Sequence, residues 1–176
     1  MNRNFISRIL LFLLFVPFLT LISCAGKSGQ TDKPVKPGTG EMADLNAFLV
    51  QKDRERIENY IQRKNLQMSE TETGLWYSVV KEGTGDCLTD NDRIILEYEC
   101  SLLDGTICYS SDESGPKEII VGKTKIEQGL DQGLRMLKQG AEAVFIIPPF
   151  LGYGFVGDGV RIPPRSIIVY HIKILK

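Results

Sequence analysis

The chain has 176 residues, of which 43% are hydrophobic and 24% are charged, a composition typical of one globular domain with short extensions. Its net charge of −1 provides no basic surface, so nucleic acid is not expected as a partner. The chain has one histidine, His171, and no Cys-x-x-Cys pair, so the sequence predicts no metal site.

The first 23 residues have the features of an export signal. Arg3 and Arg8 give a positive start, and residues 9–22 form an apolar run that is too short for an ordinary membrane-spanning helix. The tetrapeptide Leu-Ile-Ser-Cys at 21–24 resembles the bacterial lipobox, whose cysteine becomes the lipidated first residue of the mature protein. We therefore expect a signal peptide at 1–23 and a lipid on Cys24 that attaches the chain to a membrane. An ordinary signal peptide with a chance cysteine, or an uncleaved anchor, is the alternative.

Residues 24–42 are expected to form a flexible linker, because Gly, Pro, Lys and Ser dominate the segment and cannot build a core. The next segment, 43–66, predicts an amphipathic helix whose start Asp44 could cap. Its apolar face consists of Leu45, Phe48, Leu49, Ile57, Tyr60 and Ile61. Such a helix either packs on the domain or joins two chains as a homodimer, and the sequence leaves both open.

From residue 67 onward the sequence has the short patterns of strands. Residues 75–80 alternate, and Asp104-Gly105 is a strong hairpin signal within residues 93–111. The segments 117–122, 141–148 and 166–175 are further strand-like runs.

One helix is predicted between these strands. Ile126, Leu130, Leu134 and Leu137 recur at helical spacing, and Gly140 is placed to cap the C-terminus. About five strands and one helix, joined by short turns and without βαβ alternation, predict an α+β fold in which an antiparallel sheet wraps on the helix.

A glycine-rich stretch at residues 152–157, Gly-Tyr-Gly-Phe-Val-Gly, matches the G-x-G-x-x-G fingerprint of dinucleotide-binding proteins. That fingerprint requires a strand before it and a helix that opens within it. Here Pro148-Pro149 precede the glycines, Pro163-Pro164 follow them, and the next segment is a strand. No nucleotide is therefore expected as a ligand.

Four stretches together resemble the FKBP-type peptidyl-prolyl cis-trans isomerases. They are GLWYSVVKEGTG, LEYECSLLDGTICYSS, VGKTKIEQGLDQGL and IIPPFLGYGFVGDGVRIPPRSIIVYHIKIL. The last one is similar to the family pattern I-P-P-x-L-x-Y-G, a loop, I-P-P and a strand. The resemblance implies an FKBP-like isomerase domain at 67–176. With the lipobox and the amphipathic helix, the chain resembles the envelope lipoprotein branch of the family, which implies the outer membrane of a Gram-negative bacterium.

The activity that the resemblance implies needs no cofactor. Amide resonance sets a barrier of about 18–20 kcal/mol to rotation about a peptide bond. An apolar pocket that favours the twisted amide, with a few donors for the flanking carbonyls, lowers that barrier without a nucleophile or a metal. The implied partners are proline-containing polypeptides of the cell envelope, whose folding the protein assists.

The resemblance also implies the residues of the pocket. The predicted catalytic residues are Tyr98 on the wall, Tyr153 as a phenol donor, and Glu127, whose backbone N–H holds a substrate carbonyl. The predicted substrate-binding set is Tyr98, Cys108, Tyr109, Ile126, Glu127, Leu130, Tyr153, Ile162 and Tyr170.

Four positions in this set depart from the family pattern. The family commonly has Phe-Asp where this chain has Cys108-Tyr109, an aliphatic residue where it has Glu127, and often Trp where it has Leu130. A smaller Cys108 widens the pocket and Tyr109 removes a carboxylate from its rim, so we expect a proline-accepting pocket with weak activity. The alternative is an FKBP-fold chaperone or proline-peptide binding module with little or no isomerase activity.

The remaining cysteines and the histidine are not expected to take part in catalysis. Cys87, Cys100 and Cys108 are an odd number, and mostly buried free thiols are expected. His171 alternates out of phase with the apolar residues of its strand, so it is expected to face away from the helix.

Overall fold

The computed structural model describes residues 38–175. The predicted signal peptide, Cys24 and most of the predicted linker lie outside the described residues. Within 38–175, no helix combines the length and the apolar character needed to cross a bilayer.

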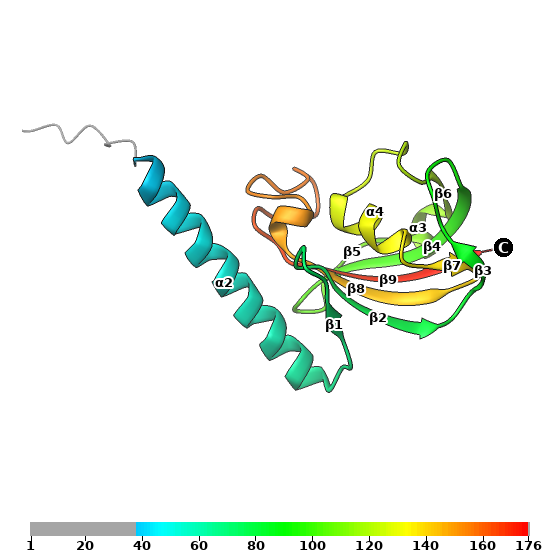
Figure 1. The fold of residues 1–176 in the computed structure, drawn as a ribbon, viewed down its shortest axis with the longest axis horizontal. Helices are drawn as coiled ribbons and strands as arrows, with labels where there is room; N and C mark the ends of the chain where they lie inside the picture. The colour runs from blue at the N-terminus through cyan, green and yellow to red at the C-terminus, as the bar shows by residue number, and fades with distance from the viewer. Residues whose placement is uncertain (1–37, 176) are drawn as a thin grey trace, which may run out of the picture. The chain divides into compact units, whose positions relative to one another are not determined.

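Antiparallel pairing organises the described strands into a main sheet of seven and a second sheet of two (Figure 1). The main sheet has the order β1-β2-β8-β9-β4-β5, with β6 also paired to β4, and β3 pairs with β7. The strands are β1 Ser69–Glu70, β2 Trp76–Lys81, β3 Thr84–Cys87, β4 Arg93–Leu102, β5 Ile107–Ser110, β6 Lys117–Ile120, β7 Lys138–Gln139, β8 Glu142–Ile147 and β9 Ile168–Leu175. The α+β prediction is confirmed, with more strands than expected because several are only two to four residues long.

Helix α4, Gln128–Leu134, lies across one face of the main sheet (Figure 1). Leu130 and Leu134 of this helix are buried in the core, which also contains Phe145 of β8. Gly133 allows close approach here, because a Cβ at that position would lie 2.6 Å from the Phe145 ring. The face of the sheet beneath α4 is therefore the apolar core of the domain.

The prediction of a helix that extends through Leu137 and is capped by Gly140 is wrong in both its length and its cap. It ends at Leu134 with Arg135 as its C-cap, and Gly140 lies between β7 and β8 at φ 78° rather than at the helix end. The chain leaves the helix because the Leu137 carbonyl accepts the Leu88 N–H at 2.9 Å and β7 then pairs with β3. The pairing of β7 with β3 therefore ends the helix, although the helical spacing of apolar residues continues in the sequence.

Two further short helical segments, which were not predicted, are α3 Ser111–Ser114 and η1 Pro149–Leu151.

Helix α2, Thr39–Lys64, starts earlier than predicted, so Asp44 lies inside it and is not its N-cap. Its second half packs on the domain: Ile57 is 1% exposed and contacts the face of the sheet away from α4. The Asp53 carboxylate accepts a hydrogen bond from Arg165 at 2.6 Å. In the first half of the helix, Leu45 and Phe48 are exposed. The predicted apolar face therefore contacts the domain only through its C-terminal part.

Candidate active site

All nine predicted site residues belong to, or contact, the apolar core on the α4 side of the main sheet. Tyr98 comes from β4, Tyr170 from β9, and Cys108 with Tyr109 from β5. Eight of the nine belong to, or pack against, the main core cluster, and Glu127 joins through a hydrogen bond to Tyr170. The remaining members are Ile126, just before α4, Leu130 within it, Tyr153 after η1 and Ile162 in the loop before β9.

Several side chains that form the walls of this site are almost fully buried. Cys108, Leu130, Ile162 and Tyr170 are 1%, 3%, 2% and 5% exposed. The rings of Tyr98 and Tyr170 are tilted at 47° with their centroids 6.2 Å apart, a favourable arrangement for two aromatic rings. These walls suit an apolar ring such as that of proline.

Polar groups meet at one point of the site, around the Glu127 carboxylate. The Tyr170 hydroxyl donates to Glu127 Oε1 at 2.9 Å. Burial, and then the negative charge of Glu127, raises the pKa of Tyr170. Burial, and then a hydrogen bond to Glu127, raises the pKa of Tyr153. Both phenols are therefore neutral donors at physiological pH.

Asp158 was missed by the sequence analysis, and it supplies a carboxylate at the rim. The Tyr109 hydroxyl donates to Asp158 Oδ2, so the tyrosine that replaces the family's aspartate binds a different aspartate from the opposite loop. This hydrogen bond, followed by burial, raises the pKa of Tyr109 to about 12. The Asp158-Gly159 dipeptide is a turn signal that could have drawn attention to this position.

Asp158 also orders the loop that carries Ile162. Its Oδ1 accepts the backbone N–H groups of Val160, Arg161 and Ile162 at 2.9, 3.0 and 2.8 Å. Burial alone raises the pKa of Asp158, but the hydrogen bonds from Tyr109 and these N–H groups outweigh it and lower the pKa to about 2. The carboxylate therefore fixes the loop in its charged form.

Asp158→Asn should make the protein's stability less sensitive to acid. Because the folded-state pKa of Asp158 is lowered, its contribution is present above pH 4 and is lost as the pH falls toward 2. That contribution is about 1 kcal/mol after allowance for solvent screening. Urea unfolding at pH 6, 4 and 2 measures it: between pH 4 and 2 the wild type should lose more unfolding free energy than Asp158→Asn. The exposed Asp86→Asn is the control, and a fall equal in all three proteins would contradict the assignment.

Arg161 fixes the same loop to the opposite wall and was also missed by the sequence analysis. Its Nη1 donates to the Cys108 carbonyl at 2.9 Å and to Glu113 Oε2 at 2.7 Å. Its guanidinium also lies over the Tyr109 ring, 5.4 Å from the centroid. The loop is therefore held on both sides of the pocket rim.

Within residues 38–175 the three cysteines are free, and two of them are buried as predicted. Cys100 lies in the core beside Tyr170, and burial raises the pKa of its thiol to about 12. Burial also raises the pKa of the Cys108 thiol. Cys87 is exposed, contrary to the general expectation of buried thiols. His171 is exposed on the face away from α4, as predicted.

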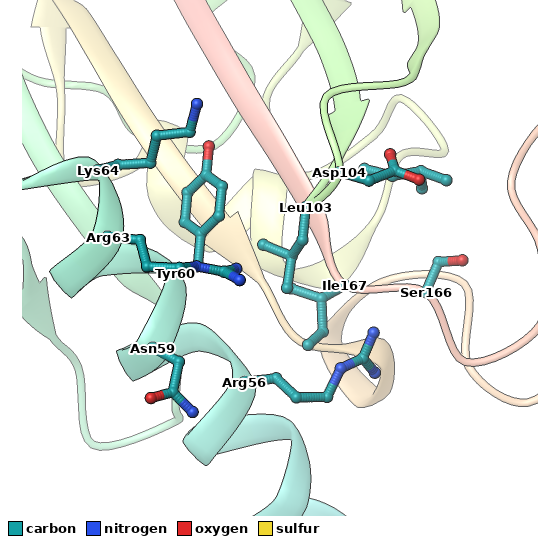
Figure 2. Close-up of a pocket in the computed structure, with 10 residues that line it drawn as sticks. Arg56, Asn59, Tyr60, Arg63, Lys64, Leu103, Asp104, Ser166 and Ile167 are labelled. Carbon is teal, nitrogen blue, oxygen red and sulfur yellow. The ribbon is translucent and has the colours of Figure 1, made fainter.

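A separate cavity of about 710 Å³ lies between α2 and the β4–β5 hairpin (Figure 2). None of the nine site residues lines it; its side chains include Arg56, Tyr60, Arg63, Lys64 and Leu103. Arg63 and Lys64 belong to the last turn of α2, where positive charge offsets the negative end of the helix dipole. The basic character of this cavity therefore has a structural explanation.

Across residues 38–175, no group of three or more His, Cys, Asp or Glu side chains is placed to hold a metal ion.

Comparison with known proteins places this geometry in a family. A family model described as FKBP-type peptidyl-prolyl cis-trans isomerase matches residues 85–175. The chain is 36% identical over 106 residues to a probable FKBP-type isomerase, FkpA, of Neisseria meningitidis, which covers 60% of this chain and 39% of the relative. It is 35% identical over 102 residues to the isomerase Mip of Chlamydia trachomatis, covering 58% of this chain and 40% of the relative. The chain thus spans less than half the length of these curated relatives.

Solved structures agree with the sequence relatives. The crystal structure of FkpA from Escherichia coli superposes with a TM-score of 0.62 at 27% identity, covering 80% of this chain and 73% of that one. The structure of AtFKBP13 superposes with a TM-score of 0.59 at 27% identity, covering 62% of this chain and 98% of that one. Fold and sequence agree, and the chain belongs to the FKBP-type peptidyl-prolyl cis-trans isomerase family.

Proposed function

We propose that this chain catalyses the cis–trans isomerisation of X-Pro peptide bonds in polypeptides of the cell envelope. The observation that carries the proposal is the convergence of nine residues, from separate elements, on one apolar site with two neutral phenol donors. Family membership supports the same activity.

The geometry supports catalysis by stabilising the twisted amide. A proline ring would pack against Leu130, Ile162 and the Tyr170 ring, where water is scarce. Twisting removes the double-bond character of the C–N bond and its charge separation, so an apolar site favours the twisted state over the planar one. A reduction of the barrier by about 5.5 kcal/mol gives roughly ten-thousand-fold acceleration.

Two donors are available for the substrate carbonyls. The Glu127 N–H has no hydrogen-bond acceptor within the described part of the chain. The Tyr153 hydroxyl lies at the end of η1, and burial keeps it protonated. These groups hold the carbonyls beside the proline while the amide rotates between them.

Tyr153→Phe should lower kcat/KM by about tenfold, since one hydrogen bond to a carbonyl contributes about 1–1.5 kcal/mol. The measurement is a protease-coupled assay with an X-Pro peptide and the detergent-solubilised full chain. Tyr60→Phe, on α2 and outside the site, is the matched control and should keep the wild-type rate. A wild-type chain no faster than buffer would sink the proposal.

A chaperone or binding module with little catalysis is the second candidate. The observation that favours it is the closure of the site: Cys108, Leu130, Ile162 and Tyr170 are at most 5% exposed. In addition, Tyr109 binds Asp158 across the rim. Suppression of the aggregation of a proline-free client, equal in wild type and Tyr153→Phe, would support this function. If every effect on clients requires prolines and is lost with Tyr153→Phe, this second function is wrong.

We also propose that Cys24 carries a lipid that anchors the domain in the outer membrane of a Gram-negative bacterium. The support is the lipobox-like Leu-Ile-Ser-Cys sequence after an apolar run, followed by a linker rich in Gly and Pro. Incorporation of labelled palmitate by the wild type and by Cys24→Ser, with membrane fractionation, tests the anchor. Equal labelling in both would refute it.

The exposed first half of α2 supports a homodimer as a further proposal for residues 43–66. Met42, Leu45 and Phe48 are 43%, 47% and 57% exposed, which is unusual for large apolar side chains on one helix. Sedimentation of the solubilised chain and of Phe48→Ser distinguishes the two states. A wild type that sediments as a monomer excludes the dimer.

A further inference from the structure

The Glu127 side chain adopts an unusual position for a residue that precedes a helix. Glu127 is the N-cap of α4, with φ −62° and ψ 142°, yet its side chain makes no capping hydrogen bond. A shorter carboxylate, that of Asp, often accepts an N–H of the first helical turn at this position. Here it turns toward the sheet and accepts the Tyr170 hydroxyl at 2.9 Å. The carboxylate therefore belongs to the pocket and not to the helix cap.

Its surroundings provide hydroxyls but no cation. The carboxylate accepts the Tyr170 hydroxyl and interacts with the Tyr153 hydroxyl, two phenols that are themselves part of, or packed against, the apolar core. No Lys or Arg within residues 38–175 forms an ion pair with Glu127. A carboxylate in an apolar site without a cation carries an electrostatic cost that a cationic ligand would relieve.

The other two carboxylates at the rim are already engaged. Glu113 pairs with Arg161 at 2.7 Å. Asp158 accepts the Tyr109 hydroxyl and three backbone N–H groups. Among these three acidic groups, Glu127 is the one whose partners in the structure are neutral, and it is partly exposed.

The backbone of the same residue places this charge beside the substrate. If the Glu127 N–H holds a substrate carbonyl, the carboxylate lies within reach of the residue next to the proline. If the Tyr153 hydroxyl donates to the other substrate carbonyl, it leaves the Glu127 carboxylate, which then needs a replacement donor. A Lys or Arg side chain of the substrate supplies both a donor and the missing positive charge.

We propose that Glu127 is a specificity-determining residue that selects peptides with lysine or arginine adjacent to the proline. The inference rests on the proposed isomerase function, and it names the substrate class of that same site. It depends on a residue that replaces the aliphatic side chain usual in the family, so it concerns this chain and not the family in general.

The test compares Lys, norleucine and Glu at the positions flanking proline in otherwise identical peptides. Norleucine keeps the apolar stem of lysine and removes its charge. The full solubilised chain is assayed for turnover and, separately, for peptide binding by fluorescence anisotropy. The wild type should prefer Lys over norleucine by about fivefold at one flanking position and should disfavour Glu by a similar factor, as is typical of a charge pair in a partly exposed site.

Two variants separate the role of the side chain from general electrostatics. Glu127→Gln keeps an acceptor for the Tyr170 hydroxyl and removes the charge, so the ratio of Lys to norleucine turnover should fall to about one, whatever the change in absolute rate. Glu82→Gln makes the same change of net charge at an exposed position in the β2–β3 connection and should keep the preference.

Each outcome distinguishes the inference from the function on which it rests. Turnover of all peptides with the same Lys preference in wild type and Glu127→Gln overturns the inference and leaves the isomerase intact. Binding with a Lys preference that Glu127→Gln abolishes, in the absence of turnover, supports the inference and overturns the isomerase. Neither turnover nor binding of any peptide overturns both.

Discussion

Phe145→Ala is expected to lower the free energy of unfolding by about 4 kcal/mol, the cost of removing a large aromatic side chain from a packed core. Phe145 is fully buried on β8, where it pairs with Tyr170 of β9 and Tyr77 of β2. Its ring also packs against α4, because Gly133 has no side chain and lets the helix backbone approach the ring closely. The resulting cavity would lie between helix and sheet, where neither can move inward without breaking strand pairing.

A loss of this size is a large part of the stability of an ordinary domain, which is about 5–15 kcal/mol. Chemical unfolding in urea, followed by circular dichroism, measures it through the shift in midpoint at constant slope. Phe150→Ala makes the same chemical change at a side chain that is 47% exposed, and it should cost less than about 1.5 kcal/mol. Equal losses at the two positions would show that the core does not depend on the contact between Phe145 and α4.

Gly157→Ala is expected to reduce kcat/KM by more than about tenfold and to destabilise the fold by about 3 kcal/mol. Gly157 has φ 73°, a conformation that costs an L-residue about 1–2 kcal/mol. An added Cβ would also lie 2.8 Å from the Pro163 carbonyl carbon and 2.9 Å from the Pro164 nitrogen, and closer still to the Ile162 carbonyl oxygen. Since these are backbone atoms, the loop must move, and Ile162 leaves the pocket wall.

Gly159→Ala is the matched control for this prediction. Gly159 lies in the same loop at φ 75°, but a Cβ there would meet no atom within 4 Å. It should therefore carry the conformational cost of about 1 kcal/mol and keep near-wild-type turnover. Isomerase assays and urea unfolding of both variants measure the two effects. If Gly159→Ala impairs turnover as much as Gly157→Ala, loop flexibility matters and the position of Ile162 does not.

The contrast between these glycines also answers why a G-x-G-x-x-G match is not a nucleotide site here. Gly154 and Gly157 both have positive φ, and Gly157 packs against the backbone of the Ile162-Pro163-Pro164 segment. The glycines let the loop fold back on itself, and no helix follows them to meet a phosphate. The context of the motif therefore remains the basis for the prediction that no nucleotide binds here.

The sequence by itself determined most of the strands, because alternation in segments such as 141–148 and 166–175 is a local property of the chain. It also indicated the nine pocket residues, since the family pattern is carried by order and spacing along the chain. The length of α4 and the role of Gly140 were not predictable in this way. After Leu137 the chain forms strand β7 and not a continued helix, because β7 pairs with β3. These two strands are far apart in sequence.

The polar chemistry of the pocket was decided by tertiary structure alone. Sequence position indicated that Tyr109 removes a carboxylate from the rim, whereas the fold brings Asp158 from another loop to bind the Tyr109 hydroxyl. Sequence position likewise assigned Glu127 a role through its backbone, and the fold turns its carboxylate toward Tyr170 on the last strand. Side chains distant in sequence compete for the same hydrogen-bond partners, and which of them meet depends on how the strands and loops pack. The sequence therefore indicated the residues of the predicted pocket, and the tertiary structure decided which charged groups lie beside them.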